Sequence, residues 1–197
     1  MQGMINRALQ IYLRDTFGLA SWHRIASEAR LGHANFEPML TYAPGTASSL
    51  VTAAEKVLER PRESLLEDMG TYLVSHSNLE AVRRLLRFGG GDFEEFLHSL
   101  EDLPGRGRLA LPELILPDMI LTLEEAGRYR LCCDEGLPGL GHVMIGLLRA
   151  MADDYGALVV LDYLGNDDCG DCIRISLLEP RFAEGRRFEL SARTERA

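Results

Sequence analysis

The residues of this sequence with the clearest capacity for chemistry are its four cysteines. Cys132 and Cys133 are adjacent, Cys169 and Cys172 form a Cys-x-x-Cys pair, and all four lie in the last third of the 197-residue chain. Two thiolates two residues apart at a hairpin can reach one tetrahedral zinc ion. A redox motif of the thioredoxin type would instead begin a helix after a strand. The spacing leaves three interpretations open: a zinc site, a disulfide switch, or four unreactive thiols.

The surroundings of these cysteines weakly favour a cation. Asp167, Asp168 and Asp171 crowd the Cys-x-x-Cys pair, and their charges disfavour a thiolate unless a cation is present. Cys132 and Cys133 end a predicted strand of the same sheet, so all four cysteines could meet. Adjacent residues of a strand point to opposite faces, however, which makes joint ligation by these two awkward.

The composition describes an acidic, folded protein. Hydrophobic residues make up 46% of the chain and charged residues 26%, which excludes a disordered chain. A net charge of −9 disfavours nucleic acid and anionic membranes as partners. The N-terminus lacks the pattern of a signal peptide, and no apolar stretch is long enough to span a bilayer. We therefore expect a cytoplasmic protein, in which thiols tend to stay reduced and a structural disulfide is the less expected state.

No arrangement of residues indicates an enzyme. Serines and acidic residues form no pattern of nucleophile and base. The paired carboxylates, such as Asp153-Asp154, fall on polar helix faces and are interpreted as solvated charge. The three glycines at 89–91 lack the preceding strand that a dinucleotide site requires.

The spacing of apolar residues predicts a helical first half followed by a small antiparallel sheet with one packed helix, an α+β fold. We expect one domain over residues 1–180, with a helical part over about 1–60 and a mixed part over about 61–180, and a loose charged tail over 181–197. Gly18 should end the first helix, and Asn78 and Asp92 should cap later ones. Helices are predicted over 5–17, 22–29, 50–58, 61–74, 78–86, 92–100 and 139–155. Strands are predicted over 108–111, 119–122, 128–133, 157–163 and 173–178.

Several short motifs occur in an order that a known family shares. They are Met1-x-Gly3-Met4-Ile5-Asn6, Phe17-Gly18-x-x-x-Trp22, Gly70-x-Tyr72, Phe93-x-x-Phe96-Leu97-x-x-Leu100, Leu111-Pro112-x-Leu114-x-x-Pro117, and Gly136-Leu137 followed by Ile145-Gly146-Leu147-Leu148. Together they resemble the heme-nitric oxide/oxygen binding (H-NOX) domains. The common order over about residues 1–178 makes the resemblance specific.

The resemblance implies a bacterial gas sensor. Domains of this family bury a heme b between a helical N-terminal part and a mixed C-terminal part, and a histidine of the C-terminal part ligates the iron. A Tyr-x-Ser-x-Arg motif holds the heme propionates. Nitric oxide breaks the iron–histidine bond, and the change of shape passes to a signalling partner such as a histidine kinase or a cyclic-dinucleotide enzyme.

Two heme-binding features of the family are absent from this sequence. The family's ligating histidine follows a Phe-Leu-x-x-Leu-x-x-Leu run, which here ends at Leu103, and the next residue is Pro104. Proline offers iron no side-chain donor. The residues from Tyr129 read Tyr-Arg-Leu-Cys-Cys, without the hydroxyls and guanidinium that would neutralise the propionates. The sequence therefore argues against the family's mode of heme ligation.

Two other histidines lie near the implied heme pocket. His98 precedes Pro104 by six residues, which on one helix would turn it roughly 120° away. His142 precedes Val143, at the position where oxygen-binding relatives carry a pocket tyrosine; the alternative is a half-buried helix histidine with an ordinary hydrogen bond. Val143 has no hydroxyl, which favours nitric oxide over oxygen as the gas. By resemblance, the residues that would face a heme are Ile5, Tyr72, His98, Pro104, Pro117, His142, Val143 and Leu147.

Two functions follow from these observations. The first is a heme-based nitric oxide sensor domain that regulates a signalling partner. The alternative is a heme-free regulatory module that senses redox state or zinc through Cys132, Cys133, Cys169 and Cys172. Some relatives carry a zinc site in this part of the chain, and Cys133 and Cys172 are similar to two of its ligands, whereas Leu161 and Leu164 stand at the other two. A third interpretation is an emptied pocket that binds another apolar ligand.

Overall fold

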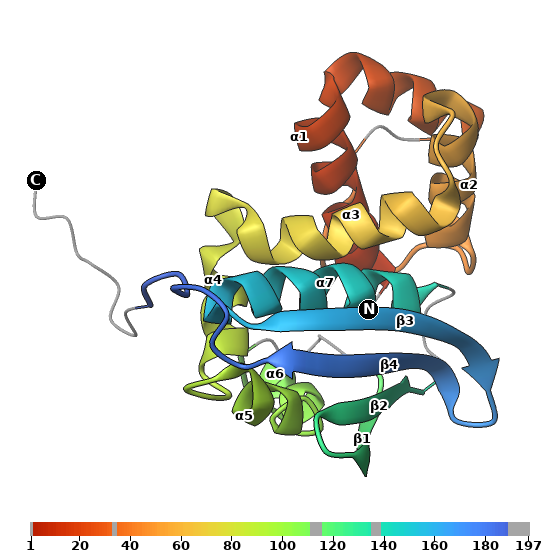
Figure 1. Cartoon of the computed structure of the whole chain (residues 1–197). Helices are drawn as coiled ribbons and strands as arrows, with labels where there is room; N and C mark the ends of the chain where they lie inside the picture. Colours follow the sequence, from red (N-terminus) through yellow and green to blue (C-terminus); the bar gives the residue numbers. More distant parts are fainter. Residues whose placement is uncertain (1, 33–34, 111–115, 135–138, 189–197) are drawn as a thin grey trace, which may run out of the picture.

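The chain forms a helical N-terminal half that lies over a four-stranded sheet. The computed structural model describes residues 2–32, 35–110, 116–134 and 139–188. Figure 1 shows the helical half above the sheet, with one long helix, α7, between them. This arrangement confirms the predicted α+β fold. Of the residues in the motifs above, Met1, Leu111, Pro112, Leu114, Gly136 and Leu137 lie outside the described ranges.

Three helices form the N-terminal half. α1 (Gln2–Glu28), α2 (Thr46–Leu58) and α3 (Arg62–Ser75) enclose an apolar cluster. Gly18 interrupts α1 with a φ of 84° and a ψ of 162°, a backbone conformation that only glycine adopts readily. The predicted helix end at Gly18 is thus confirmed as a break within α1. The largest buried members of this cluster are Tyr12, Leu13, Trp22, Ile25, Phe36 and Leu50.

Short helices lead from α3 towards the sheet. The predicted cap Asp92 is confirmed, because its carboxylate accepts from the backbone N–H of Glu95 at 2.9 Å. The Glu95 carboxylate in turn accepts from the N–H of Gly91 at 2.8 Å. The predicted cap Asn78 is wrong, because Asn78 lies inside a 3₁₀ turn, where its N–H donates to Nδ1 of His76 at 3.3 Å. The elements are η1 (Ser77–Leu79), α4 (Glu80–Arg87) and α5 (Phe93–His98).

The predicted strand over residues 108–111 is wrong. Its first three residues end a helix, α6 (Leu103–Ala110), and the fourth lies outside the described ranges. Leu103 and Gly107, four residues apart, are both buried. A strand would turn Leu109 to the same side as Gly107, yet Leu109 is 88% exposed. The burial therefore follows the helical period and not the alternation of a strand.

The strands form one antiparallel sheet in the order β1-β2-β4-β3. Alternation places Tyr129, Leu131 and Ile173 on its covered face, where they are fully buried. α7 (Leu140–Tyr155), which confirms the predicted helix over 139–155, lies over β3 and β4 (Figure 1). The remaining predicted strands are confirmed as β1 (Met119–Glu125), β2 (Arg128–Cys133), β3 (Leu158–Asp167) and β4 (Gly170–Glu179).

α3 and α7 approach each other closely because glycines lie at their contact. A Cβ added to Gly70 would overlap the carbonyl oxygen of Val143, and a Cβ added to Gly146 would overlap that of Glu67. The Thr71 hydroxyl donates to the carbonyl of Gly146 across the same contact at 3.2 Å. A second apolar cluster fills the space between α5, α6, α7 and the sheet. Because α3 contributes side chains to both clusters, it joins the helical part to the mixed part.

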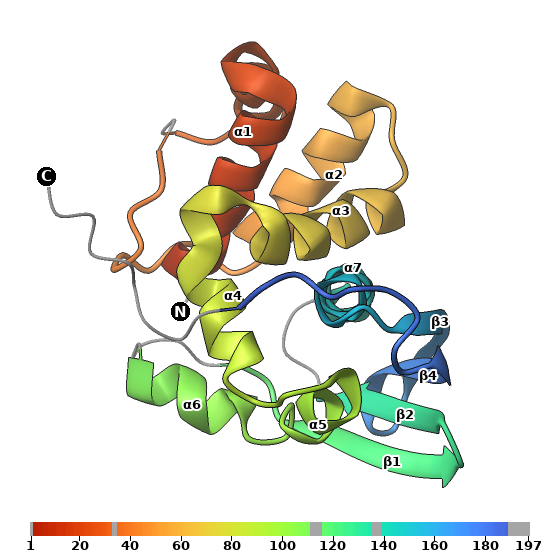
Figure 2. The ribbon, with the colours of Figure 1, turned by 60° about the vertical axis from the view of Figure 1, so that its left-hand side comes forward.

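Residues 182–188, here named the C-terminal segment, lie against α4 and the end of α7. Figure 2 shows the chain leaving the sheet and crossing α7 towards α4. The N–H groups of Phe182 and Ala183 donate to the carbonyl of Gly156 at 2.8 and 3.0 Å, and that of Arg186 donates to the carbonyl of Asp154 at 2.8 Å. The expectation of a loose tail is therefore wrong for these residues, and residues 189–197 lie outside the described ranges.

Candidate functional site

The four cysteines occupy three different environments. Cys132 and Cys172 are partners in the register of β2 and β4, with Cα atoms 4.3 Å apart, and they form a disulfide. Cys133 lies on the opposite face of β2, is fully buried and is not bonded to another cysteine. Cys169 is exposed in the turn between β3 and β4. The structure thus brings two of the four cysteines together. They form a disulfide, although the sequence analysis expected the thiols to stay reduced.

Asp167 lies beside the disulfide. Its Oδ1 is 3.4 Å from Sγ of Cys172 and accepts from the N–H of Cys169 at 2.8 Å. The Sγ atoms of Cys132 and Cys172 and a carboxylate oxygen of Asp167 all lie within 4.8 Å of one another. Arg130 forms an ion pair with the same carboxylate. In the reduced form, these residues would offer a metal three donors, whereas Cys133 faces away from them.

His142 lies at the meeting point of α3, α7 and β3. Its ring packs against that of Tyr163, with centroids 4.3 Å apart, and its Nδ1 is 3.6 Å from a carboxylate oxygen of Glu67. That nitrogen is buried and has no hydrogen-bond partner among the described residues. The result is the predicted half-buried helix histidine, but without the ordinary hydrogen bond.

Asp171 fixes the surroundings of His142. Its carboxylate accepts from the N–H of Gly141 in the first turn of α7 at 2.8 Å and from the hydroxyl of Tyr163 at 2.6 Å. Burial, and then the hydrogen bond to Asp171, raise the pKa of Tyr163 to about 12. The tyrosine therefore stays a hydrogen-bond donor over the physiological range of pH.

The sequence analysis related His98 to Pro104 by the period of one helix, but the two residues lie on different helices. α5 ends at His98 and α6 begins at Leu103, so a single helical period does not relate them. The side chain of His98 is exposed, and its ring meets the edge of Tyr129 at 5.9 Å between centroids. Pro104 is buried in the first turn of α6, a position where proline costs a helix little. Its buried side chain offers no donor to a metal.

The other residues assigned to a heme pocket by resemblance are divided between the two apolar clusters. Ile5, Tyr72 and Val143 pack against the N-terminal cluster, whereas Leu147 belongs to the cluster over the sheet. The Tyr72 hydroxyl is turned to α1, where it donates to Asp15 at 2.8 Å. Pro117 is half-buried just before β1.

The donor set of the described residues does not fit the family's mode of heme ligation. Heme iron takes a neutral imidazole whose other nitrogen is supported by a hydrogen bond. His98 is exposed, and the ring of His142 packs against that of Tyr163, with its Nδ1 3.6 Å from a carboxylate oxygen of Glu67. The residues from Tyr129 to Cys133, read in the sequence as the place of the propionate-binding motif, lie in β2 and bring no arginine or serine at the motif's spacing.

Comparison with known proteins shows the class to which this chain belongs. The family model described as Haem-NO-binding matches residues 2–162, and the chain belongs to this family. Within that class, the solved structures that it resembles are H-NOX proteins. The Fe(II) unliganded H-NOX protein from K. algicida has a TM-score of 0.74 at 19% identity and covers 91% of this chain and 97% of its own. A mutant H-NOX protein from S. oneidensis has a TM-score of 0.74 at 18% identity, covering 92% of this chain and 98% of its own.

The chain is also similar to curated signalling enzymes. Soluble guanylate cyclase 89Db from Drosophila melanogaster is 21% identical over 173 residues, which are 86% of this chain and 26% of that protein. Soluble guanylate cyclase gcy-31 from Caenorhabditis elegans is 22% identical over 165 residues, 83% of this chain and 24% of that protein. The chain therefore spans about a quarter of the length of these relatives. The matched family is one of sensor domains, which are not themselves catalytic. No helix in the described ranges is long and apolar enough to cross a membrane.

Sequence reasoning missed a buried ionic cluster between α4 and α7. Asp154, which was interpreted as solvated charge, is 4% exposed and pairs with Arg83, which is 7% exposed. The pair is 71 residues apart in the chain, so no local pattern reveals it. Arg83 and Arg87 are one turn apart on α4, but that helix also carries the apolar residues Val82, Leu85 and Leu86, so the spacing of the arginines did not mark them as buried.

Proposed function

We propose that this chain is a regulatory sensor domain of the Haem-NO-binding family that works without the family's histidine–iron bond. The observation that carries the proposal is the buried proline, Pro104, at the place of the iron ligand. His98 is exposed and the ring of His142 packs against Tyr163, which argues against either as a substitute. The domain keeps the fold through which its relatives regulate signalling, and we expect its partner to be a cytoplasmic signalling protein such as a histidine kinase, a cyclic-dinucleotide enzyme or a cyclase.

A substitution series at α6 tests this proposal. Pro104→His places an imidazole at the family's ligand position, and Leu109→His adds the same group at an exposed position of the same helix. After incubation with hemin and gel filtration, we expect Pro104→His to retain more heme than the wild type or Leu109→His. Equal, stoichiometric heme in the wild type and in Pro104→His, with the same spectrum, would contradict the proposal.

A second candidate function is favoured by the disulfide between Cys132 and Cys172. We propose that this pair responds to redox state. A dithiol reductant gives the disulfide two electrons and two protons, so that the protein gains two thiols while the reductant becomes a disulfide. The reduced pair and Asp167 then supply three donors to a zinc ion, with a fourth from water or the exposed Cys169.

Zinc analysis separates this candidate from inert thiols. We expect the reduced wild type to retain about one zinc per chain after dialysis, and the oxidised protein to retain none. Cys132→Ser should lose zinc in both states. Cys133→Ser, which removes a thiol from the other face of the same strand, should keep it. No zinc in the reduced wild type, together with equal stability of the two redox forms, would rule this candidate out.

A further inference from the structure

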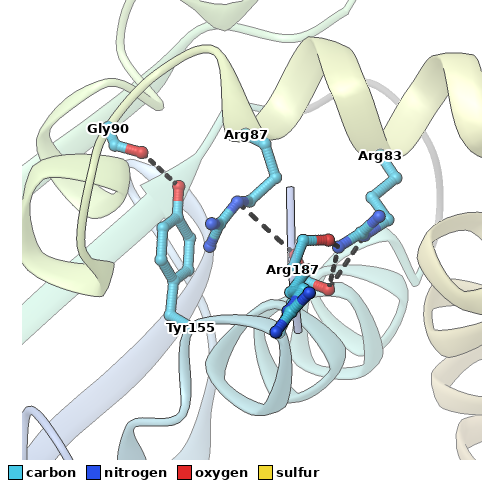
Figure 3. Close-up of polar contacts among 6 residues, drawn as sticks. Arg83, Arg87, Gly90, Tyr155 and Arg187 are labelled. Atoms are coloured by element: carbon cyan, nitrogen blue, oxygen red, sulfur yellow. Dashed lines mark hydrogen bonds and ion pairs between the residues drawn. The ribbon is translucent and has the colours of Figure 1, made fainter. Parts of the chain in front are cut away.

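The C-terminal segment is held by two arginines, Arg83 and Arg87, here named the arginine pair. Both lie on α4 and face Asp154 near the end of α7. Arg83 donates to one oxygen of Asp154 through Nε at 2.8 Å and pairs with it through Nη2 at 2.7 Å. Figure 3 shows Arg83 also reaching Arg187, whose carbonyl oxygen accepts from Nη2 at 3.2 Å. One buried guanidinium thus ties α4 to both α7 and the C-terminal segment.

Arg87 is held by aromatic rings more than by hydrogen bonds. Its Cζ lies 3.9 Å from the ring centroid of Tyr155 and 5.1 Å from that of Phe188 in the C-terminal segment. Its Nε and Nη1 are buried and have no hydrogen-bond partner within the described part of the chain. Tyr155 is itself fixed, because its hydroxyl donates to the carbonyl of Gly90 at 2.9 Å (Figure 3). Phe188 therefore covers a cation that depends on ring faces for stabilisation.

The charges of this cluster do not cancel. Two guanidiniums, with side chains 8% and 12% exposed, share the single carboxylate of Asp154, which is 3% exposed. Arg87 is the weaker partner, with its Nε 3.6 Å from the carboxylate. A buried charge without full pairing is costly, and the rings of Tyr155 and Phe188 over Arg87 offset part of that cost.

The backbone of α7 is shaped to receive this segment. Gly156, with a φ of 76°, lies so close to the carbonyl of Ala183 that a Cβ would overlap it. A Cβ at Gly185 would lie 2.8 Å from the backbone carbonyl of Tyr155. Glycines on both sides thus allow the two backbones to meet, and the bonds to the carbonyls of Gly156 and Asp154 follow from that approach.

We infer that the C-terminal segment is a latch that fixes α4 to α7. α4 joins α3 to α5, so its position links the helical half to the part of the chain that carries Pro104. A seated segment holds α4 in place, and a shift of α4 must break the contacts of the arginine pair with Arg187 and Phe188. Because such coupling is reciprocal, release of the segment also loosens α4. The latch does not depend on whether the domain responds to heme, to the redox state of Cys132 and Cys172, or to another ligand.

Amide hydrogen exchange of the whole chain tests the latch. Phe188→Ala removes one ring and leaves every charge in place, and Phe182→Ala is the matched control, because Phe182 lies in the same segment with its side chain 64% exposed. We expect Phe188→Ala to speed exchange at Arg186 about tenfold, and to speed exchange at Phe88 and Gly89 at the end of α4 as well. Phe182→Ala should leave these rates unchanged.

Two results would overturn the inference. The first is wild-type exchange at Arg186 as fast as that of an unprotected amide. The second is faster exchange at Arg186 in Phe188→Ala without any change at Phe88 and Gly89, which would make the segment a passive attachment. The amide of Leu131 in β2 serves as the reference for global unfolding, and in all three proteins its exchange should stay much slower than that of Arg186. Arg87→Gln provides a second variant, with the same expected loss of protection at Arg186 and at the end of α4.

Discussion

Adjacent residues of one strand have different chemistry in this protein. Cys132 faces Cys172 and is oxidised, whereas Cys133 points to the covered face of the sheet and stays a thiol. Burial, and then the charge of Asp171, raise the pKa of Cys133 from 9.0 to about 12. The sequence predicted the opposite faces, because alternation along a strand is a local property. It left the disulfide as one of three open interpretations, because the pairing of β2 with β4 depends on a contact 40 residues apart.

The raised pKa of Cys133 predicts a specific loss of stability in alkali. The unfolded chain releases this proton first as the pH rises, so the contribution to stability is full below about pH 9 and is lost towards pH 12. Between about pH 9 and 10, the free energy of unfolding should fall by roughly 1 kcal/mol more in the wild type than in Cys133→Ala. Urea unfolding at each pH measures this difference. Cys169→Ala, at an exposed thiol, should follow the wild type, and equal slopes in wild type and Cys133→Ala would contradict the burial of this thiol.

At the scale of elements, the contact of α3 with α7 depends on two glycines. Gly70 and Gly146 let the two helix backbones meet, and any side chain at either position would overlap a carbonyl oxygen. The contact joins the helical half of the molecule to the helix that covers the sheet. The stabilisation from this contact therefore outweighs the cost of placing glycine inside a helix.

Gly70→Ala should destabilise the protein by about 3 kcal/mol, because the added methyl group must separate α3 from α7. Gly105→Ala is the matched control, since Gly105 lies in α6 with open space around the position of a Cβ. That substitution should stabilise the protein by about 0.5–1 kcal/mol through helix preference alone. Urea unfolding of both variants provides the comparison. Similar free energies of unfolding for the two would show that the helices do not meet as described.

The elements that the sequence predicted well are those in which apolar residues recur at a regular spacing. α7 and the strands from β1 to β4 were predicted from alternation or from a 3.6-residue period over many residues. α6 was mistaken for a strand in part, because it is short and Leu109 is apolar yet exposed. The C-terminal segment was mistaken for a loose tail, because its seat on α4 and α7 uses backbone carbonyls and a distant arginine pair, which leave no pattern in its own residues.

At the scale of the whole molecule, the sequence predicted the fold more fully than it predicted the residues that could bind a ligand. The order of motifs predicted the family, and the family match over residues 2–162 confirmed it. The resemblance implied that Pro104 stands at the ligand position, but the environments of His98 and His142 needed the structure, because each depends on a neighbour from another element. The chain thus belongs to the Haem-NO-binding family, and we propose that it lacks the family's iron ligand.

The absorption spectrum of the purified whole chain, before and after addition of hemin and gel filtration, tests this account most directly. We predict no stoichiometric Soret band of a histidine-ligated heme in the wild type, because Pro104 offers iron no donor. A Soret band corresponding to one heme per chain that survives gel filtration and shifts on addition of nitric oxide would contradict it.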